Sequence, residues 1–174
     1  MNFLSDNQST VFPEIINYLQ YINKNSLDSY GNDPITKKAQ KIVSDFFDKK
    51  VQIRYVSSGT ASNSISLASI CPPYGGIICS DSSHLYSDEC GAPEFFTGGA
   101  KLIQIPTSNG LITAENLKNK INSFGLHGIH EIKLSALSLT QLSELGTVYE
   151  IDELTKASNM LIVVIFVNVI NLFI

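Results

Sequence analysis

Arginine is nearly absent from this chain of 174 residues. Arg54 is the only arginine, and 12 basic residues face 16 acidic ones, for a net charge of −4. Without a basic stripe, the sequence lacks the electrostatic footprint of a nucleic-acid-binding protein. A guanidinium group can bind both oxygens of a carboxylate, but the single one here lies within an expected strand. Any clamp for a substrate carboxylate must therefore come from elsewhere.

Cysteine is also scarce, and no secretory signal opens the sequence. The three cysteines, Cys71, Cys79 and Cys90, have neither a CxxC spacing nor that of metal ligands, which favours reduced thiols in a cytoplasmic protein. The first residues contain no basic segment and no apolar core. His127 and His130 have no further ligand cluster beside them, so we expect a loop there and no metal site.

Apolar spacing predicts alternating helices and strands. The 44% hydrophobic content suits one domain with a real core. Helices are expected from a cap at Thr10 to residue 22, from a cap at Asn32 or Asp33 through residue 47, and after residue 58, residue 113 and about residue 152. Strands are expected over residues 51–56, 77–80, 101–105 and 132–139. This alternation predicts an α/β fold with a mostly parallel sheet and flanking helices.

The turn that follows the first expected strand is rich in hydroxyl groups. Ser57, Ser58, Gly59 and Thr60 lead directly into a helix, where free backbone N–H groups and the positive end of the helix dipole favour an anion. The alternative is an ordinary strand-to-helix connection. In parallel sheets, ligands bind at the carboxyl ends of the strands. We therefore expect this turn to converge with two other polar loops, residues 81–91 and 140–146.

Five groups of short motifs, taken in their order along the chain, resemble those of a known family. The matching motifs are Ser5-Asp6-Asn7, Tyr30-Gly31-Asn32-Asp33-Pro34, Ser58-Gly59-Thr60 with Asn63, His84-Leu85-Tyr86 leading to Glu89-Cys90-Gly91, and Gly146-Thr147-Val148-Tyr149 with Glu153-Leu154. In this order they resemble the N-terminal half of the threonine aldolase and β-eliminating lyase family. That family consists of pyridoxal-phosphate (PLP) enzymes with the aspartate aminotransferase-like fold. The resemblance implies an incomplete PLP-transferase-like large domain.

The resemblance also implies roles for individual residues. Ser58, Gly59 and Thr60 would hold the phosphate of PLP, and His84 would lie against the pyridine ring and assist in proton transfer. Glu89 would lie at the edge of the site and order a water or His84. On the substrate side, Ser5 would contact the carboxylate and Gln141 would border the pocket.

Each of these roles has a simpler structural alternative. His84 could cap a loop or donate to a carbonyl group. Glu89, next to Asp88, could belong to a solvated surface pair. Ser5 lies in a terminal segment, and such segments are commonly mobile.

Two features that the family requires are missing from the matched region. The lysine that binds PLP covalently and the aspartate of an Asp-Gly-Ala-Arg strand, which holds the pyridine nitrogen, both lie beyond it in the family. The last lysine here, Lys156, is expected on a helix surface. We divide the chain into residues 1–158, the family-like part, and residues 159–174, an apolar tail. The tail could begin as a buried strand; it is short for a membrane anchor, and a membrane location is not favoured.

Two classes of function follow. The first is a lyase that cleaves β-hydroxy-α-amino acids, such as threonine to glycine and acetaldehyde, truncated before its lysine and inactive alone. A complementing C-terminal fragment would restore it, and relatives suggest a homo-oligomer. The second is a non-catalytic remnant or a partner-binding fragment.

Overall fold

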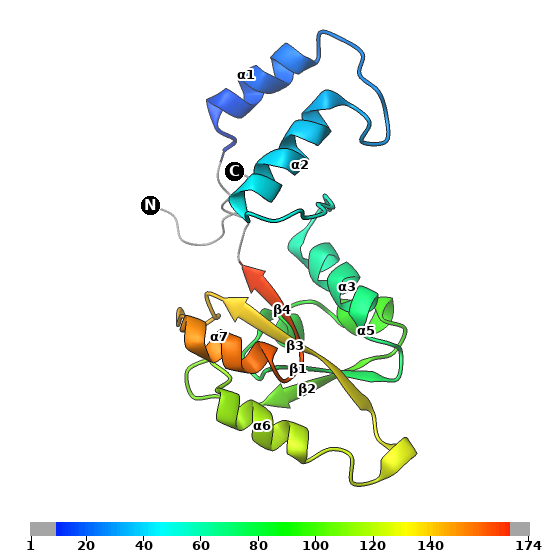
Figure 1. Ribbon diagram of the computed structural model, residues 1–174, viewed down its shortest axis with the longest axis vertical. Coiled ribbons are helices and arrows are strands. Elements are labelled where there is room, and N and C mark those ends of the chain that lie inside the picture. The colour runs from blue at the N-terminus through cyan, green and yellow to red at the C-terminus, as the bar shows by residue number, and fades with distance from the viewer. Residues whose placement is uncertain (1–9, 168–174) are drawn as a thin grey trace. The chain divides into compact units, whose positions relative to one another are not determined.

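The computed structural model describes residues 10–167, and for residues 163–167 only the backbone (Figure 1). The described residues divide into two compact units, residues 10–56 and residues 57–167. The division of the chain into family-like residues 1–158 and a tail remains a prediction.

The first unit contains two helices. Helix α1 (Pro13–Ile22) begins after Phe12, which makes no side-chain cap, so the expected cap at Thr10 is wrong. Helix α2 (Pro34–Phe46) begins as predicted, because the Asp33 carboxylate accepts the Thr36 N–H at 2.8 Å. None of residues 10–56 is buried, so the apolar stripes of these helices are not covered by a core within this unit.

The strand expected over residues 51–56 does not form in the described structure. Side chains of α2 bind its backbone instead: the Ile53 N–H donates to Gln40 Oε1 at 3.1 Å, and the Val51 N–H donates to Ser44 Oγ at 3.4 Å. A strand needs a ladder of backbone partners, and the alternating apolar pattern alone does not supply one.

The second unit is a parallel sheet of four strands. Strands β1 (Gly75–Ser80), β2 (Lys101–Ile105), β3 (Lys133–Gln141) and β4 (Ile162–Val167) stand in the order β2-β1-β3-β4. Each adjacent pair is parallel. The predicted α/β class with a parallel sheet is confirmed. The apolar tail begins as β4, which pairs with β3 from Ala136 opposite Ile162 to Gln141 opposite Val167.

Helices cover both faces of this sheet (Figure 1). Helices α6 (Ala114–Asn122) and α7 (Ile151–Ser158) lie on one face, and α3 (Gly59–Ile70) lies on the other with the short helices α4 (His84–Ser87) and α5 (Ala92–Phe96). A 3₁₀ turn, Gly128–His130, precedes β3.

Alternating side chains of β1 fill two separate cores. Ile78 joins the core under α6 and α7, while Ile77 and Cys79 join the core under α3. All three side chains are fully buried. The sheet is therefore covered on both sides, and the loops at the carboxyl ends of its strands remain to form a site.

Candidate functional site

The first part of the candidate site is the beginning of α3. Ser58 caps this helix, with its hydroxyl accepting the Ala61 N–H at 3.2 Å. The Gly59 and Thr60 N–H groups open the helix and precede its first intrahelical bonds. A Cβ atom built on Gly59 would meet no other atom within 4 Å. The turn therefore offers backbone N–H groups and hydroxyls to open space, an arrangement that fits a phosphate group.

The second part is a buried carboxylate. Glu89 follows α4 and has only 2% of its surface exposed. Its Oε1 atom accepts a hydrogen bond from the Asn63 amide on α3 and lies 3.3 Å from Nδ1 of His84. Its Oε2 atom is buried and has no hydrogen-bond partner among the described residues. Glu89 is therefore not a member of a solvated surface pair, and it contacts the histidine that the sequence paired with it.

The environment of Glu89 shifts its carboxyl group toward protonation relative to an ordinary glutamate. Burial raises the pKa of its carboxyl group, and the hydrogen bonds from Asn63 and His84 oppose this rise only in part. His84 differs from Glu89 in exposure, since 47% of its side chain is accessible. The accessible imidazole of His84 therefore lies beside the buried carboxyl group of Glu89.

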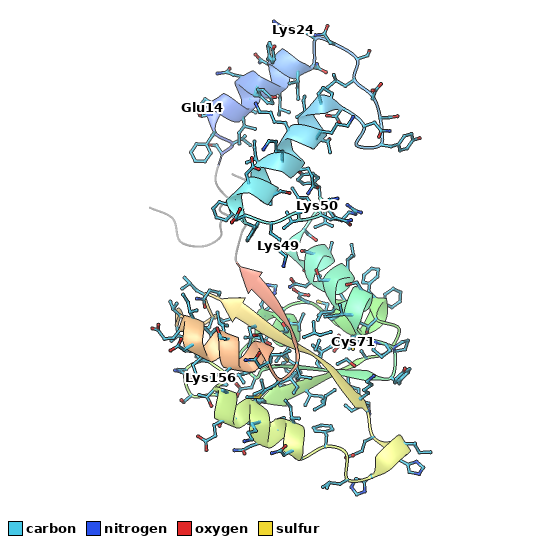
Figure 2. All side chains as sticks on the ribbon, viewed as in Figure 1. Glu14, Lys24, Lys49, Lys50, Cys71 and Lys156 are labelled. Atoms are coloured by element: carbon cyan, nitrogen blue, oxygen red, sulfur yellow. The ribbon has the colours of Figure 1, made fainter. Side chains whose placement is uncertain are left out.

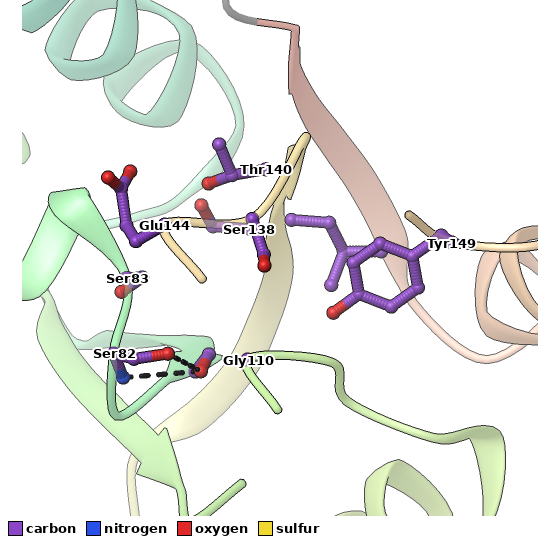
Figure 3. A pocket seen from close by; sticks show the side chains of 10 residues that line it. Ser82, Ser83, Gly110, Ser138, Thr140, Glu144 and Tyr149 are labelled. Carbon is purple, nitrogen blue, oxygen red and sulfur yellow. Dashed lines mark hydrogen bonds between the residues drawn. The ribbon is translucent and has the colours of Figure 1, made fainter. Parts of the chain in front are cut away.

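The loop after β3 meets the loop after β1 around a small polar cavity of about 10 Å³ (Figure 3). The hydroxyl groups of Ser83 and Ser138 in its lining are buried and without a partner among the described residues. Its lining also includes Ser82, Thr140 and Glu144. The loops after β1 and β3 therefore meet at the carboxyl ends of these strands, and the Asn63–Glu89 contact connects α3 to the loop after β1. Convergence of the turn at residues 57–60 with both loops stays a prediction.

The structure does not show a substrate-facing position for either of the two residues that the resemblance assigns to substrate binding. Ser5 lies outside the described residues. Gln141 ends β3, and both ends of its side-chain amide bind the backbone of Tyr149, at 2.9 Å and 3.3 Å. A contact of Gln141 with substrate stays a prediction.

Asn63 belongs to one of the family motifs, but the sequence alone indicated no role for it. The structure places it one turn into α3, against Glu89. Its position four residues after Gly59 was a usable signal, because residues four apart lie on one face of a helix. The buried serines of the cavity, Ser83 and Ser138, were missed because single serines in strands and loops carry no sequence signal.

Lysines of the second unit lie away from these loops. Lys101 and Lys133 stand at the amino ends of β2 and β3, the opposite edge of the sheet, and Lys118 and Lys120 belong to α6. Lys156 is exposed on α7, as predicted, and bonds Glu153 at 2.7 Å (Figure 2). Within residues 57–167, no lysine therefore lies in the loops that carry His84 and Glu89.

The described part of the chain contains no cluster of metal-binding side chains and no helix that could span a membrane. No group of three or more His, Cys, Asp or Glu side chains in residues 10–167 could hold a metal ion. Over the same residues, no helix combines the length and the apolar character needed to cross a bilayer.

Comparisons with known proteins identify relatives of this chain. The family model described as beta-eliminating lyase matches residues 2–161. The chain is 36% identical over 117 residues to a low specificity L-threonine aldolase of Pseudomonas aeruginosa, an alignment that covers 67% of this chain and 34% of the relative. The matched part thus spans about a third of the length of the curated relatives.

Solved structures give the same fold. A threonine aldolase from Leishmania major superposes with a TM-score of 0.85 at 20% identity, over 94% of this chain and 48% of the other. A serine palmitoyltransferase from S. paucimobilis with PLP and myriocin bound superposes with a TM-score of 0.57 at 14% identity, over 89% of this chain and 37% of the other.

Proposed function

We propose that this chain, which belongs to the beta-eliminating lyase family, carries one part of the active site of a PLP-dependent lyase. The substrate class is a β-hydroxy-α-amino acid, and the reaction cleaves threonine to glycine and acetaldehyde. The observation that carries the proposal is the juxtaposition of the open α3 N-terminus with the His84–Glu89 pair through Asn63. The resemblance to curated threonine aldolases supports the choice of substrate.

The residues of α3 would hold PLP by its phosphate. Gly59 leaves open space for the close approach of a phosphate, and Ser58 and Thr60 add hydroxyl donors to the N–H groups of the first turn. PLP, when bound, supplies an electron sink for the electron pair released as the Cα–Cβ bond breaks. The chain's own task is to bind and orient these groups and to manage protons.

His84 and Glu89 would handle the proton of the substrate hydroxyl group. The imidazole is accessible enough to stack on an aromatic ring, while Glu89 Oε1 lies beside its Nδ1 atom. A proton on Nδ1 leaves Nε2 as the acceptor for the substrate proton. Gln141 and Ser5 are proposed to lie on the substrate side, although the amide of Gln141 is already bound to Tyr149.

The lysine and the aspartate that complete a PLP site would come from protein outside these 174 residues. The positions of the lysines in residues 57–167 support this view, since none lies in the site loops. A complementing C-terminal fragment would supply them, and the chain by itself would not cleave threonine. Its three free cysteines fit a cytoplasmic protein.

Binding of PLP to the purified chain tests the proposal. We expect PLP to quench the protein's tyrosine fluorescence and to bind about tenfold or more tighter than pyridoxal, which lacks the phosphate. The double variant Ser58→Ala/Thr60→Val should lose this preference, and Ser69→Ala, at the far end of α3, should keep it. Equal affinity for PLP and pyridoxal would refute the phosphate site. Glycine release from threonine by the chain alone would refute the proposed inactivity.

A second candidate is a fragment that binds a partner without catalysis. It is favoured by Phe95 and Phe96 on α5, which are 79% and 60% exposed and stack edge to face. Exposed aromatic pairs are common at interfaces. Absence of PLP binding by a folded chain would favour this candidate over the lyase.

A further inference from the structure

Asn63 joins the two halves of the candidate site. It lies on α3, one turn beyond Gly59, and its half-buried amide reaches across to the carboxylate of Glu89 in the loop after β1. An ionised carboxylate can only accept hydrogen bonds, so the amide nitrogen of Asn63 must face it. The anion-binding turn and the acid–histidine pair are thereby connected through one side chain.

Glu89 depends on its two donors for its orientation. Oε1 takes the hydrogen bond from Asn63 and lies 3.3 Å from His84 Nδ1, while Oε2 has no partner among the described residues. A buried carboxylate is costly unless hydrogen bonds compensate for the lost water. Since 47% of the His84 side chain is exposed, Asn63 is the more sheltered of the two donors.

The position of Oε1 decides which imidazole nitrogen carries the proton. When a carboxylate oxygen faces Nδ1, the hydrogen stays on Nδ1 and the lone pair is left on Nε2. A free histidine side chain prefers the other tautomer, with hydrogen on Nε2. The tautomer of His84 is therefore a property that the surrounding residues must impose.

We propose that Asn63 is a positioning residue that holds Glu89 Oε1 against His84 Nδ1 and so keeps His84 in the Nδ1–H tautomer, with Nε2 free to accept a proton. The role of this tautomer in a reaction rests on the proposed lyase function. The tautomer itself does not, because it follows from contacts within the chain. The rise in the pKa of Glu89 on burial supports the need for a second donor.

Nitrogen-15 NMR of the imidazole rings tests this proposal on the full chain without cofactor. The spectra are recorded at about pH 8, above the ordinary pKa values of glutamate and histidine side chains. The wild-type spectrum should show His84 mainly as Nδ1–H, while His127 and His130, both exposed, should show the ordinary Nε2–H preference. In Asn63→Ala, the Nδ1–H to Nε2–H ratio of His84 should fall about fivefold to tenfold, as for the loss of one hydrogen bond.

Two further variants separate positioning from general damage. Asn63→Gln retains an amide donor and should restore part of the Nδ1–H signal, whereas Ser62→Ala, an exposed neighbour on α3, should leave the spectrum unchanged. Backbone amide spectra identify any variant that unfolds, in which case Asn63→Asp, which replaces the donor by an acceptor, serves instead of Asn63→Ala.

Two results would overturn the proposal. One is a wild-type His84 in the Nε2–H form, and the other is a folded Asn63→Ala protein with an unchanged tautomer ratio. Neither result depends on PLP, so a failure here is distinct from a failure of the chain to bind PLP through α3.

Discussion

The side-chain amide of Gln141 pairs with the backbone of Tyr149 through two hydrogen bonds. The Tyr149 N–H donates to Oε1 at 2.9 Å, and Nε2 donates to the Tyr149 carbonyl at 3.3 Å. The Tyr149 hydroxyl in turn accepts the Ile112 N–H at 2.8 Å from within the core. Gln141 thus closes the loop after β3 as a neighbouring strand would, and its polar atoms are used for structure.

Replacing Gln141 by Glu should destabilise the protein. The carboxylate keeps the acceptor for the Tyr149 N–H but loses the donor, and it faces the Tyr149 carbonyl. We expect the free energy of unfolding to fall by about 1–2 kcal/mol in urea titrations. Gln52→Glu, at an exposed position, is the control and should change it little. Equal urea midpoints for the two variants would show that the two hydrogen bonds between Gln141 and Tyr149 contribute nothing to stability.

The raised pKa of Glu89 predicts a pH-dependent stability. The folded protein holds the proton more tightly than the unfolded chain, whose carboxyl has the ordinary value of 4.5. The stability contributed by the protonated acid is full below that value and is lost as pH rises through the raised pKa. Glu89→Gln cannot lose a proton, so its stability relative to wild type should increase with pH across this window.

Urea unfolding at a series of pH values measures this difference. Subtracting wild type from variant at each pH cancels the other carboxylates, including Asp81, whose pKa is lowered by its hydrogen bonds to Thr107. Asp88→Asn, at the exposed neighbouring position, is the control for the removal of a nearby carboxylate. A flat difference for Glu89→Gln would mean that the pKa of Glu89 is not raised.

The three cysteines should differ sharply in reactivity. Burial raises the pKa of Cys79 to about 11 and also raises the pKa of Cys71, whereas Cys90 is exposed. Only the thiolate reacts with iodoacetamide, so at about pH 8 Cys90 should be labelled while the other two are protected. Peptide mass spectrometry measures this, with urea-unfolded protein, labelled at all three, as the reference. Rapid labelling of Cys79 in the folded chain would contradict the burial of β1.

Two glycine substitutions should separate binding from folding. A methyl group at Gly59 meets no atom within 4 Å, so Gly59→Ala should leave stability unchanged or raise it by up to about 1 kcal/mol. It should nevertheless weaken PLP binding, because the methyl group enters the space above the turn.

Gly75→Ala is the opposite case and serves as the control. Its Cβ would lie 2.5 Å from Cys71 Sγ and 2.9 Å from the Pro72 carbonyl oxygen, so we expect a loss of about 1–3 kcal/mol. Thermal unfolding and PLP titration of both variants give the comparison. Normal PLP affinity in Gly59→Ala would place the phosphate elsewhere.

Local sequence signals predicted most of the second unit. The apolar runs at 77–80, 101–105 and 132–139 became β1, β2 and β3 within two residues at each end, because buried parallel strands need continuous apolar side chains. The helix starts after residues 58 and 113 were also predicted correctly, because Ser58 and Thr113 cap these helices through bonds only three residues away. The helix α5 was not predicted, because its five residues carry too little periodicity.

The sequence by itself determined the α/β class, the helix start after Ser58 and the identity of the family, since all three depend on short-range order along the chain. Tertiary structure alone decided that residues 51–56 form no strand, that Glu89 is buried, and that Asn63 and His84 meet on it. These outcomes depend on partners brought together by folding: a strand requires another backbone beside it, and a carboxylate is buried or solvated according to what packs over it.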